Sequence, residues 1–291
     1  MTPAKAGSFL TDSEVLQDWS RRSNKPYLNG IEPKRDRGLL CEATLHSCRA
    51  ILCHNHCMRI YIIRHADPDY PNNTITPKGH IEAEALAVRM ERIGLDRIYT
   101  SPMGRARDTA AYTAKRLGIE PEVEDWTAEL HWIQKTPKLN RSGATWDYSG
   151  EDFRSGTEHP TPHTWHTLPP VHDDDLGERW MQLEENSNAF LAKHGFVREG
   201  RMYRSLRQNT EKIAVFCHGG FGLTWLAHLL EIPVSTMWSG FWLPPTSVSM
   251  VLMEQQSAEW AVPRCVGLGD TSHLYEAGLP IQPRGVYALN W

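Results

Sequence analysis

The sequence has no long hydrophobic run and no excess of positive charge. None of its 291 residues falls in an apolar stretch approaching the roughly 18 that a membrane-spanning helix needs. The formal net charge of -4 excludes the overall basic character typical of nucleic-acid-binding domains. We therefore expect no membrane and no nucleic acid as partner, and any anion binding must be local.

Cysteine is also scarce, and the amino terminus lacks the apolar core of a signal peptide. Six cysteines over this length do not form a disulfide scaffold. The opening MTPAKAGSFLTDSEVL carries acidic residues early and resembles neither a secretory nor a transit peptide. These features predict a cytoplasmic protein and leave its oligomeric state open.

Residues 1–57 differ in character from the rest of the chain. They are polar and weakly periodic, and they end in the Cys/His-rich stretch CRAILCHNHC. We interpret them as a poorly ordered extension. The spacing in CHNHC (53–57) does not match the paired-ligand patterns of zinc sites, so we predict no metal site and no cofactor.

From Met58 onward, apolar strands alternate with amphipathic helices. MRIYII (58–63) has the continuous apolar character of a strand buried on both faces. A helix is expected over 77–93, with Thr76 as its N-cap and Gly94 at its end. Further strands are expected at 97–101, 120–126, 212–218 and finally 247–253, and further helices at 103–118, 176–195 and 221–230.

This alternation predicts a three-layer α/β/α sandwich with a mostly parallel central sheet, formed by residues 58–291. The pattern is lost between about 133 and 175, where we predict an inserted lid. Tryptophan is abundant, with 11 residues. Core packing is the simpler interpretation of these aromatics, and an aromatic wall of a substrate pocket is the alternative.

Cationic side chains follow three of the expected strands. Arg64 and His65 come directly after the first strand, Arg105 follows RIYTS, and His218 with Gly219 follows KIAVFC. Ligands of open parallel sheets bind at the carboxyl ends of the strands. We therefore expect these residues to converge on one anion pocket, where the N-terminus of the next helix would add backbone donors.

Three motifs give this pattern a family. They resemble three elements of the histidine phosphatase superfamily, which has the phosphoglycerate mutase-like fold. The matches are IYIIRHADPDY for the Arg-His-Gly element, YTSPMGRARDTA for the Ser-Pro-x-x-Arg-Ala-x-x-Thr-Ala element and VFCHGG for the second-histidine element. The resemblance runs from about Met58 to near the C-terminus. It implies a phosphatase that needs no metal. The large insertion rich in Trp and His suggests that the substrate, which the sequence does not identify, is a small phosphorylated molecule held under a lid.

The resemblance also implies roles for individual residues. His65 would attack phosphorus and form a phosphohistidine, while Arg64 and Arg105 would hold the phosphoryl oxygens in forked geometry. His218 and Gly219 would be further substrate-binding groups, and His218 would donate to the developing charge.

Glu129 is the candidate general acid, with Asp67 and Glu124 as substitutes. Outside this set, we interpret Ser101 and Thr109 as helix-start and packing residues and His273 as a packing or supporting residue. The role of the lid histidines His159, His163, His166 and His172 is left open.

The resulting interpretation is a phosphomonoester phosphatase with a phosphohistidine intermediate. A phosphoglycerate mutase-type transferase and a non-catalytic phosphate-binding module on the same fold are the alternatives. Ala66 stands where the family has glycine, and the mutase-type substrate signature is not visible, which favours the phosphatase over the mutase.

Overall fold

The computed structural model describes residues 57–136, 141–171 and 174–286. The extension expected at 1–57 lies outside this range except for Cys57, so it stays a prediction. The same holds for the rest of the Cys/His-rich stretch and for His172.

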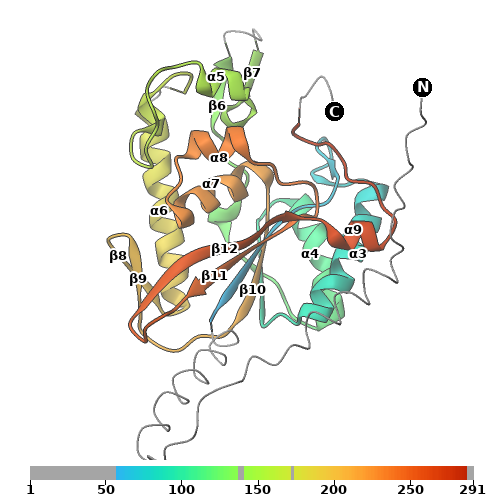
Figure 1. The fold of residues 1–291 in the computed structure, drawn as a ribbon. Helices are drawn as coiled ribbons and strands as arrows, with labels where there is room; N and C mark the ends of the chain where they lie inside the picture. The colour runs from blue at the N-terminus through green and yellow to red at the C-terminus, as the bar shows by residue number, and fades with distance from the viewer. Residues whose placement is uncertain (1–56, 137–140, 172–173, 287–291) are drawn as a thin grey trace, which may run out of the picture. The chain divides into compact units, whose positions relative to one another are not determined.

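The centre of the fold is an eight-stranded sheet with the strand order β5-β4-β10-β1-β11-β12-β9-β8 (Figure 1). Its strands are β1 (Arg59–Arg64), β4 (Arg97–Thr100), β5 (Glu122–Val123), β8 (Phe196–Glu199), β9 (Met202–Ser205), β10 (Lys212–Cys217), β11 (Val248–Glu254) and β12 (Trp260–Asp270). Strands β5, β4, β10 and β1 are parallel, and β11, β12, β9 and β8 continue the sheet in antiparallel fashion.

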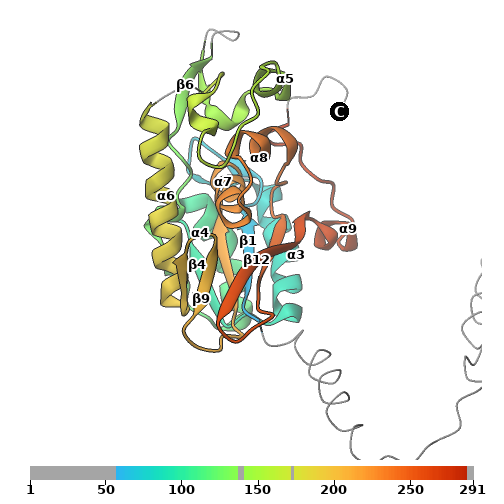
Figure 2. The same ribbon diagram turned by 60° about the vertical axis from the view of Figure 1, so that its left-hand side comes forward.

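Helices cover both faces of this sheet (Figure 2). The long ones are α3 (Pro77–Ile93), α4 (Gly104–Leu117), α6 (Asp174–Lys193) and α7 (Gly219–Leu230), and the short ones are α5 (Gly150–Arg154), α8 (Val234–Gly240) and α9 (Ser272–Glu276). Small elements between them are β2 (Pro68–Asp69), β3 (Thr74–Ile75), β6 (Ile133–Thr136), β7 (Arg141–Ala144) and the single turns η2 (Asp125–Thr127), η3 (Thr145–Asp147) and η4 (Trp165–Thr167).

The apolar run of β1 is buried on both faces because successive side chains point to opposite sides of a strand. Tyr61 and Ile63 pack with Leu86 of α3 in one core cluster. Ile60 and Ile62 belong to the other cluster, which includes side chains of α6 and α7. The three-layer α/β/α arrangement predicted from the sequence is thereby confirmed.

The predicted boundaries of the helix after β1 are also confirmed. The Thr76 side chain caps α3 by accepting a hydrogen bond from the Gly79 amide. The helix ends at Gly94, whose φ of 69° is a conformation that glycine adopts without steric cost.

Other expectations were wrong in detail. The strand at 247–253 is not the last, because β12 follows it; Pro263, Gly267 and Gly269 interrupt the strand pattern there. Half of the sheet is antiparallel, so it is mixed rather than mostly parallel. Helix α7 begins at Gly219 instead of 221, with His218 as its N-cap residue.

The segment expected to be an irregular lid contains several short elements. In Figure 1 it lies next to α8, which contacts α5, η3 and η4. Its Trp165 is fully buried and stacks at 6.2 Å on Trp132, with Trp180 and Trp238 at its edges. Core packing thus explains these tryptophans. Among the described residues, no helix is both long and apolar enough to cross a bilayer.

Candidate active site

His65 follows the last residue of β1 and is only 1% exposed. Its Nδ1 lies 2.7 Å from the carbonyl oxygen of Ala66. Because a carbonyl only accepts hydrogen bonds, this contact places the proton on Nδ1 and leaves a lone pair on Nε2. Burial holds the pKa of His65 well below its usual value, and Arg64 lowers it further. The ring is therefore neutral, with Nε2 as a potential nucleophile.

His218 occupies the corresponding position after β10. Its ring centre lies 5.2 Å from that of His65, and its Nε2 lies 2.7 Å from the Ser101 hydroxyl oxygen. Within the described part of the chain, nothing bonds its buried Nδ1. Burial, followed by the field of His65, lowers the pKa of His218 well below the usual value. The two imidazoles form a neutral pair at adjacent strand ends.

Two arginines at this site have unsatisfied donors. Arg64 and Arg105 are each 6% exposed, and the Nε of each is buried with no hydrogen-bond partner among the described residues. Arg64 Nη1 donates to two backbone carbonyls, and Arg105 Nη1 donates to Asn73 Oδ1 at 3.3 Å. Buried unpaired N–H groups are costly, so this deficit marks a site that an anion would complete.

Glu129 contacts the N-terminus of α7. Its carboxylate accepts hydrogen bonds from the amides of Gly220 at 3.3 Å and Phe221 at 2.8 Å. Two of the backbone donors that we expected to serve a phosphate therefore serve Glu129. Burial nevertheless raises the pKa of Glu129, against the lowering effect of these hydrogen bonds. The result is a carboxyl group that holds its proton to higher pH, beside two cations.

The glycines after His218 differ in what surrounds them. A Cβ at Gly219 would lie 3.4 Å from the Arg64 guanidinium, an ordinary contact. A Cβ at Gly220 would lie 2.6 Å from the ring of Trp146 and 2.9 Å from Glu129 Oε1. Trp146 is one of the tryptophans for which core packing or a pocket wall was predicted, but nothing in the sequence pattern around it indicates that it reaches α7.

The two substitutes for Glu129, Asp67 and Glu124, are hydrogen-bonded to other side chains. Asp67 accepts hydrogen bonds from Arg284 at 2.7 Å and from the Thr76 hydroxyl at 2.8 Å. Glu124 pairs with Lys193 at 2.6 Å and accepts from the Trp126 indole at 2.9 Å. Glu129 is the better placed of the three carboxyl groups.

Ser101 contacts His218 directly, whereas Thr109 and His273 are each linked to His65 through one intervening residue. Thr109 Oγ1 accepts from the Ala66 amide at 3.0 Å, and His273 Nε2 lies 3.1 Å from Thr246 Oγ1, whose amide donates to the His65 carbonyl. The supporting role expected of His273 and the packing role of Thr109 agree with these contacts. The helix-start interpretation of Ser101 was incomplete, because its hydroxyl holds His218.

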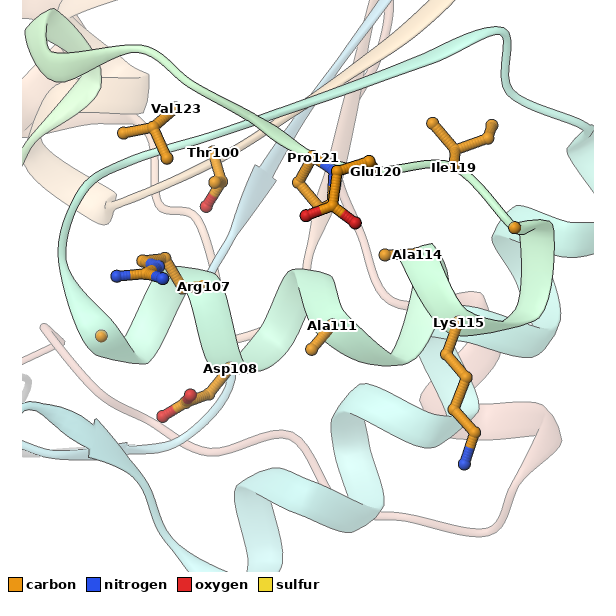
Figure 3. Close-up of a pocket in the computed structure, with 12 residues that line it drawn as sticks. Thr100, Arg107, Asp108, Ala111, Ala114, Lys115, Ile119, Glu120, Pro121 and Val123 are labelled. Carbon is orange, nitrogen blue, oxygen red and sulfur yellow. The ribbon is translucent and has the colours of Figure 1, made fainter.

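The lid histidines that the structure describes, His159, His163 and His166, show no contact with the histidine pair. His159 and His163 are exposed, and His166 packs at the edge of Trp165. A separate groove of about 940 Å³ runs along α4 and is lined by Arg107, Asp108, Lys115 and Glu120 among others (Figure 3). None of the predicted site residues lines it. Among the described residues, no group of three His, Cys, Asp or Glu side chains is arranged to hold a metal ion.

The model of the histidine phosphatase superfamily (branch 1) matches residues 60–265 of the sequence. The chain belongs to this superfamily. The family predicted from the three motifs is therefore confirmed.

Individual relatives are more distant. The chain is 26% identical over 144 residues to "Putative phosphoserine phosphatase 2" of Hydrogenobacter thermophilus, covering 46% of this chain but only 64% of that relative. Among solved structures, the phosphoserine phosphatase of Entamoeba histolytica in complex with 3-phosphoglyceric acid aligns with a TM-score of 0.50 at 18% identity, over 75% of this chain and 99% of that one. The structure titled mycobacterial hydrolase 2 gives 0.52 at 17% identity, over 77% and 97%. At these identities the structural likeness supports the fold alone.

Proposed function

We propose that this chain is a phosphomonoester phosphatase that works through a phosphohistidine at His65. The observation that carries the proposal is the hydrogen bond between His65 Nδ1 and the Ala66 carbonyl, which leaves the Nε2 lone pair beside two arginines with unmet donors. Membership of the superfamily and the phosphatase names of its relatives support the same class of reaction.

In the first step, Nε2 of His65 attacks phosphorus and the bond from phosphorus to the ester oxygen breaks. Glu129 gives its proton to the departing oxygen, which leaves as an alcohol. Arg64, Arg105 and His218 hold the phosphoryl oxygens, whose charge is redistributed in the transition state. His218 bonds the Ser101 hydroxyl through Nε2, and its Nδ1, which has no partner among the described residues, would be the atom that donates to a phosphoryl oxygen.

In the second step, a water molecule attacks the phosphohistidine and the bond between phosphorus and Nε2 breaks. Glu129, now a carboxylate, takes the proton from this water, so inorganic phosphate leaves and the starting state returns. No metal has a role in either step. The substrate we propose is a small phosphorylated organic molecule, and the setting a cytoplasmic one.

The proposal is tested by measuring phosphate release from an aryl phosphate in the presence of a chelator, with wild type and His65→Ala compared. We expect release by the wild type and loss to background in the variant. Wild-type enzyme quenched with denaturant at alkaline pH should carry a base-stable, acid-labile phosphoryl group that His65→Ala lacks.

Labelling of His65 with little free phosphate would instead favour a mutase, which retains the phosphoryl group and passes it to a second hydroxyl. The absence of both labelling and phosphate release would refute the proposal and favour a binding module.

A further inference from the structure

The segment that follows α9, residues 279–286, runs back to the active site; we call it the C-terminal strap. Most of its side chains are exposed, so little apolar burial holds it in place. Its polar contacts are concentrated at Arg284. The carbonyl of Arg284 accepts from Arg64 Nη1 at 2.9 Å and from the Trp242 indole at 2.9 Å, and its Nε donates to Asp67 Oδ1 at 2.7 Å. One residue of the strap thus contacts the chain on both sides of His65.

The contact with Arg64 bears on how this arginine is oriented. Arg64 Nη1 donates to two carbonyls, that of Leu243 at 2.6 Å in the body of the domain and that of Arg284 in the strap. Because a guanidinium is planar, fixing both donor directions of Nη1 also fixes the edge formed by Nε and Nη2. That Nε is the buried atom with no partner in the described residues. The strap therefore supplies one of two contacts that aim the free edge of Arg64.

The contact with Asp67 gives the strap a rigid anchor. The Asp67 side chain is only 7% exposed, against 49% for Arg284. Its second carboxylate oxygen accepts from Thr76, and its amide donates to the buried Glu82 at 2.9 Å. A Cβ at Gly79 would lie 2.6 Å from the Asp67 carbonyl oxygen, so α3 packs directly against this turn. Asp67 is therefore the fixed partner of the ion pair, and Arg284 is the exposed one.

From these contacts we propose that the C-terminal strap is a detachable positioning element for Arg64, with the Arg284–Asp67 ion pair as its latch. The inference rests on the proposed function in one respect, the binding of a phosphoryl group by Arg64. If the strap favours the anion-binding orientation of Arg64, an anion bound there must favour the attached strap by the same factor, because coupling between two binding events is reciprocal.

This reciprocity is tested by trypsin, which cleaves after Arg284 only when the strap is detached. The full-length protein is digested with and without orthovanadate, a phosphoryl-like anion, and release of the peptide 285–291 is followed by mass spectrometry. We expect vanadate to slow this cleavage at least threefold. Cleavage after Arg201, whose side chain is 83% exposed, serves as the internal control and should not change. Equal rates of cleavage after Arg284 with and without vanadate would overturn the proposal.

Variants test the latch itself. Asp67→Asn should speed cleavage after Arg284. Arg284→Ala should raise the Ki of vanadate about tenfold and lower kcat about tenfold, because a small displacement of a positioned group is costly. The matched control is Arg92→Ala, which removes an exposed ion pair with Glu276 that does not reach Arg64. It should leave the Ki of vanadate and kcat unchanged. Arg284→Ala with a lower Tm but an unchanged Ki would show that the strap is merely structural.

The two failures can be told apart. Absence of hydrolysis in wild type and of labelling at His65 would overturn the proposed phosphatase, whereas vanadate protection would still report on the strap. An active enzyme whose strap ignores vanadate would overturn only the inference about the strap.

Discussion

The two ends of the candidate site are built differently. The phosphate end consists of Arg64, His65 and His218, and these residues lie directly at the ends of neighbouring strands. The register pairs Arg64 with Cys217, so the next residues, the two histidines, emerge side by side. Strand pairing therefore brings the backbones of these three residues together.

The leaving-group end depends on segments outside the sheet. Glu129 comes from the loop after η2, and Trp146 comes from η3 in the inserted segment. These two meet at Gly220, where no Cβ could be accommodated without movement. The phosphate end is thus specified by strand pairing and the leaving-group end by loop packing, so substitutions at the two ends should have different signatures.

The largest effect is expected for Arg105→Lys, whose side chain acts on the phosphate end from the first turn of α4. Lysine keeps the charge but loses the planar fork that contacts two phosphoryl oxygens. We expect kcat/KM for an aryl phosphate to fall by roughly 10²–10³-fold, the usual cost of losing a donor that stabilises transition-state charge. Arg107→Lys, in the outer groove two residues along the same helix, is the control and should be close to wild type. Equal effects of the two substitutions would contradict the predicted role of Arg105.

At the leaving-group end, Glu129→Gln should act through proton transfer. Because burial raises the pKa of Glu129, the wild-type kcat/KM, which reports the first step, should fall as pH rises through that raised value, when the acid loses its proton. The variant should lose this dependence and about 10²-fold in kcat/KM for an alkyl phosphate, whose leaving group needs the proton. For p-nitrophenyl phosphate the loss in kcat/KM should be much smaller. The same loss with both leaving groups would argue against Glu129 as the general acid.

The same variant, Glu129→Gln, should lose activity without losing thermal stability. A carboxyl whose pKa is higher in the folded than in the unfolded chain destabilises the fold as pH rises above its unfolded value. Glu129→Gln removes that cost, so its Tm should be at or above the wild-type value near neutral pH and should gain nothing at pH 4. Thermal unfolding at both pH values checks this.

The adjacent glycines provide a smaller, steric test of the same end. Gly220→Ala forces a methyl group against Trp146 and Glu129. Overpacking of this kind typically lowers the free energy of unfolding by about 1–3 kcal/mol, so we expect a lower Tm. Gly219→Ala makes only an ordinary contact and should unfold near the wild-type temperature. If the clash with Trp146 is the cause, Trp146→Ala should restore the Tm of Gly220→Ala. Equal Tm values for the two single glycine variants would rule out the close approach.

The same contrast explains what the sequence could predict. Arg64, His65 and His218 could be placed because apolar runs identify the strands and parallel strands bring their carboxyl ends together. Glu129 could be matched to a family position, but its contact with α7 could not be foreseen. Trp146 and Arg284 depend on long-range packing of segments without periodicity, and no local pattern encodes that. The antiparallel half of the sheet was missed in part for a local reason, since glycine and proline in β12 obscure its strand pattern.

Ser101 lies between these two cases and should give the smallest effect. It follows β4, whose Thr100 pairs with Phe216 of β10, so the sheet brings its hydroxyl to His218. Ser101→Ala removes this hydrogen bond and frees the His218 ring to change tautomer. The net value of one such bond is about 1 kcal/mol, so kcat should fall roughly fivefold. Ser101→Thr, which keeps the hydroxyl, should retain most of the wild-type activity. If Ser101→Thr is as impaired as Ser101→Ala, then His218 depends on packing against Ser101 and not on the hydrogen bond.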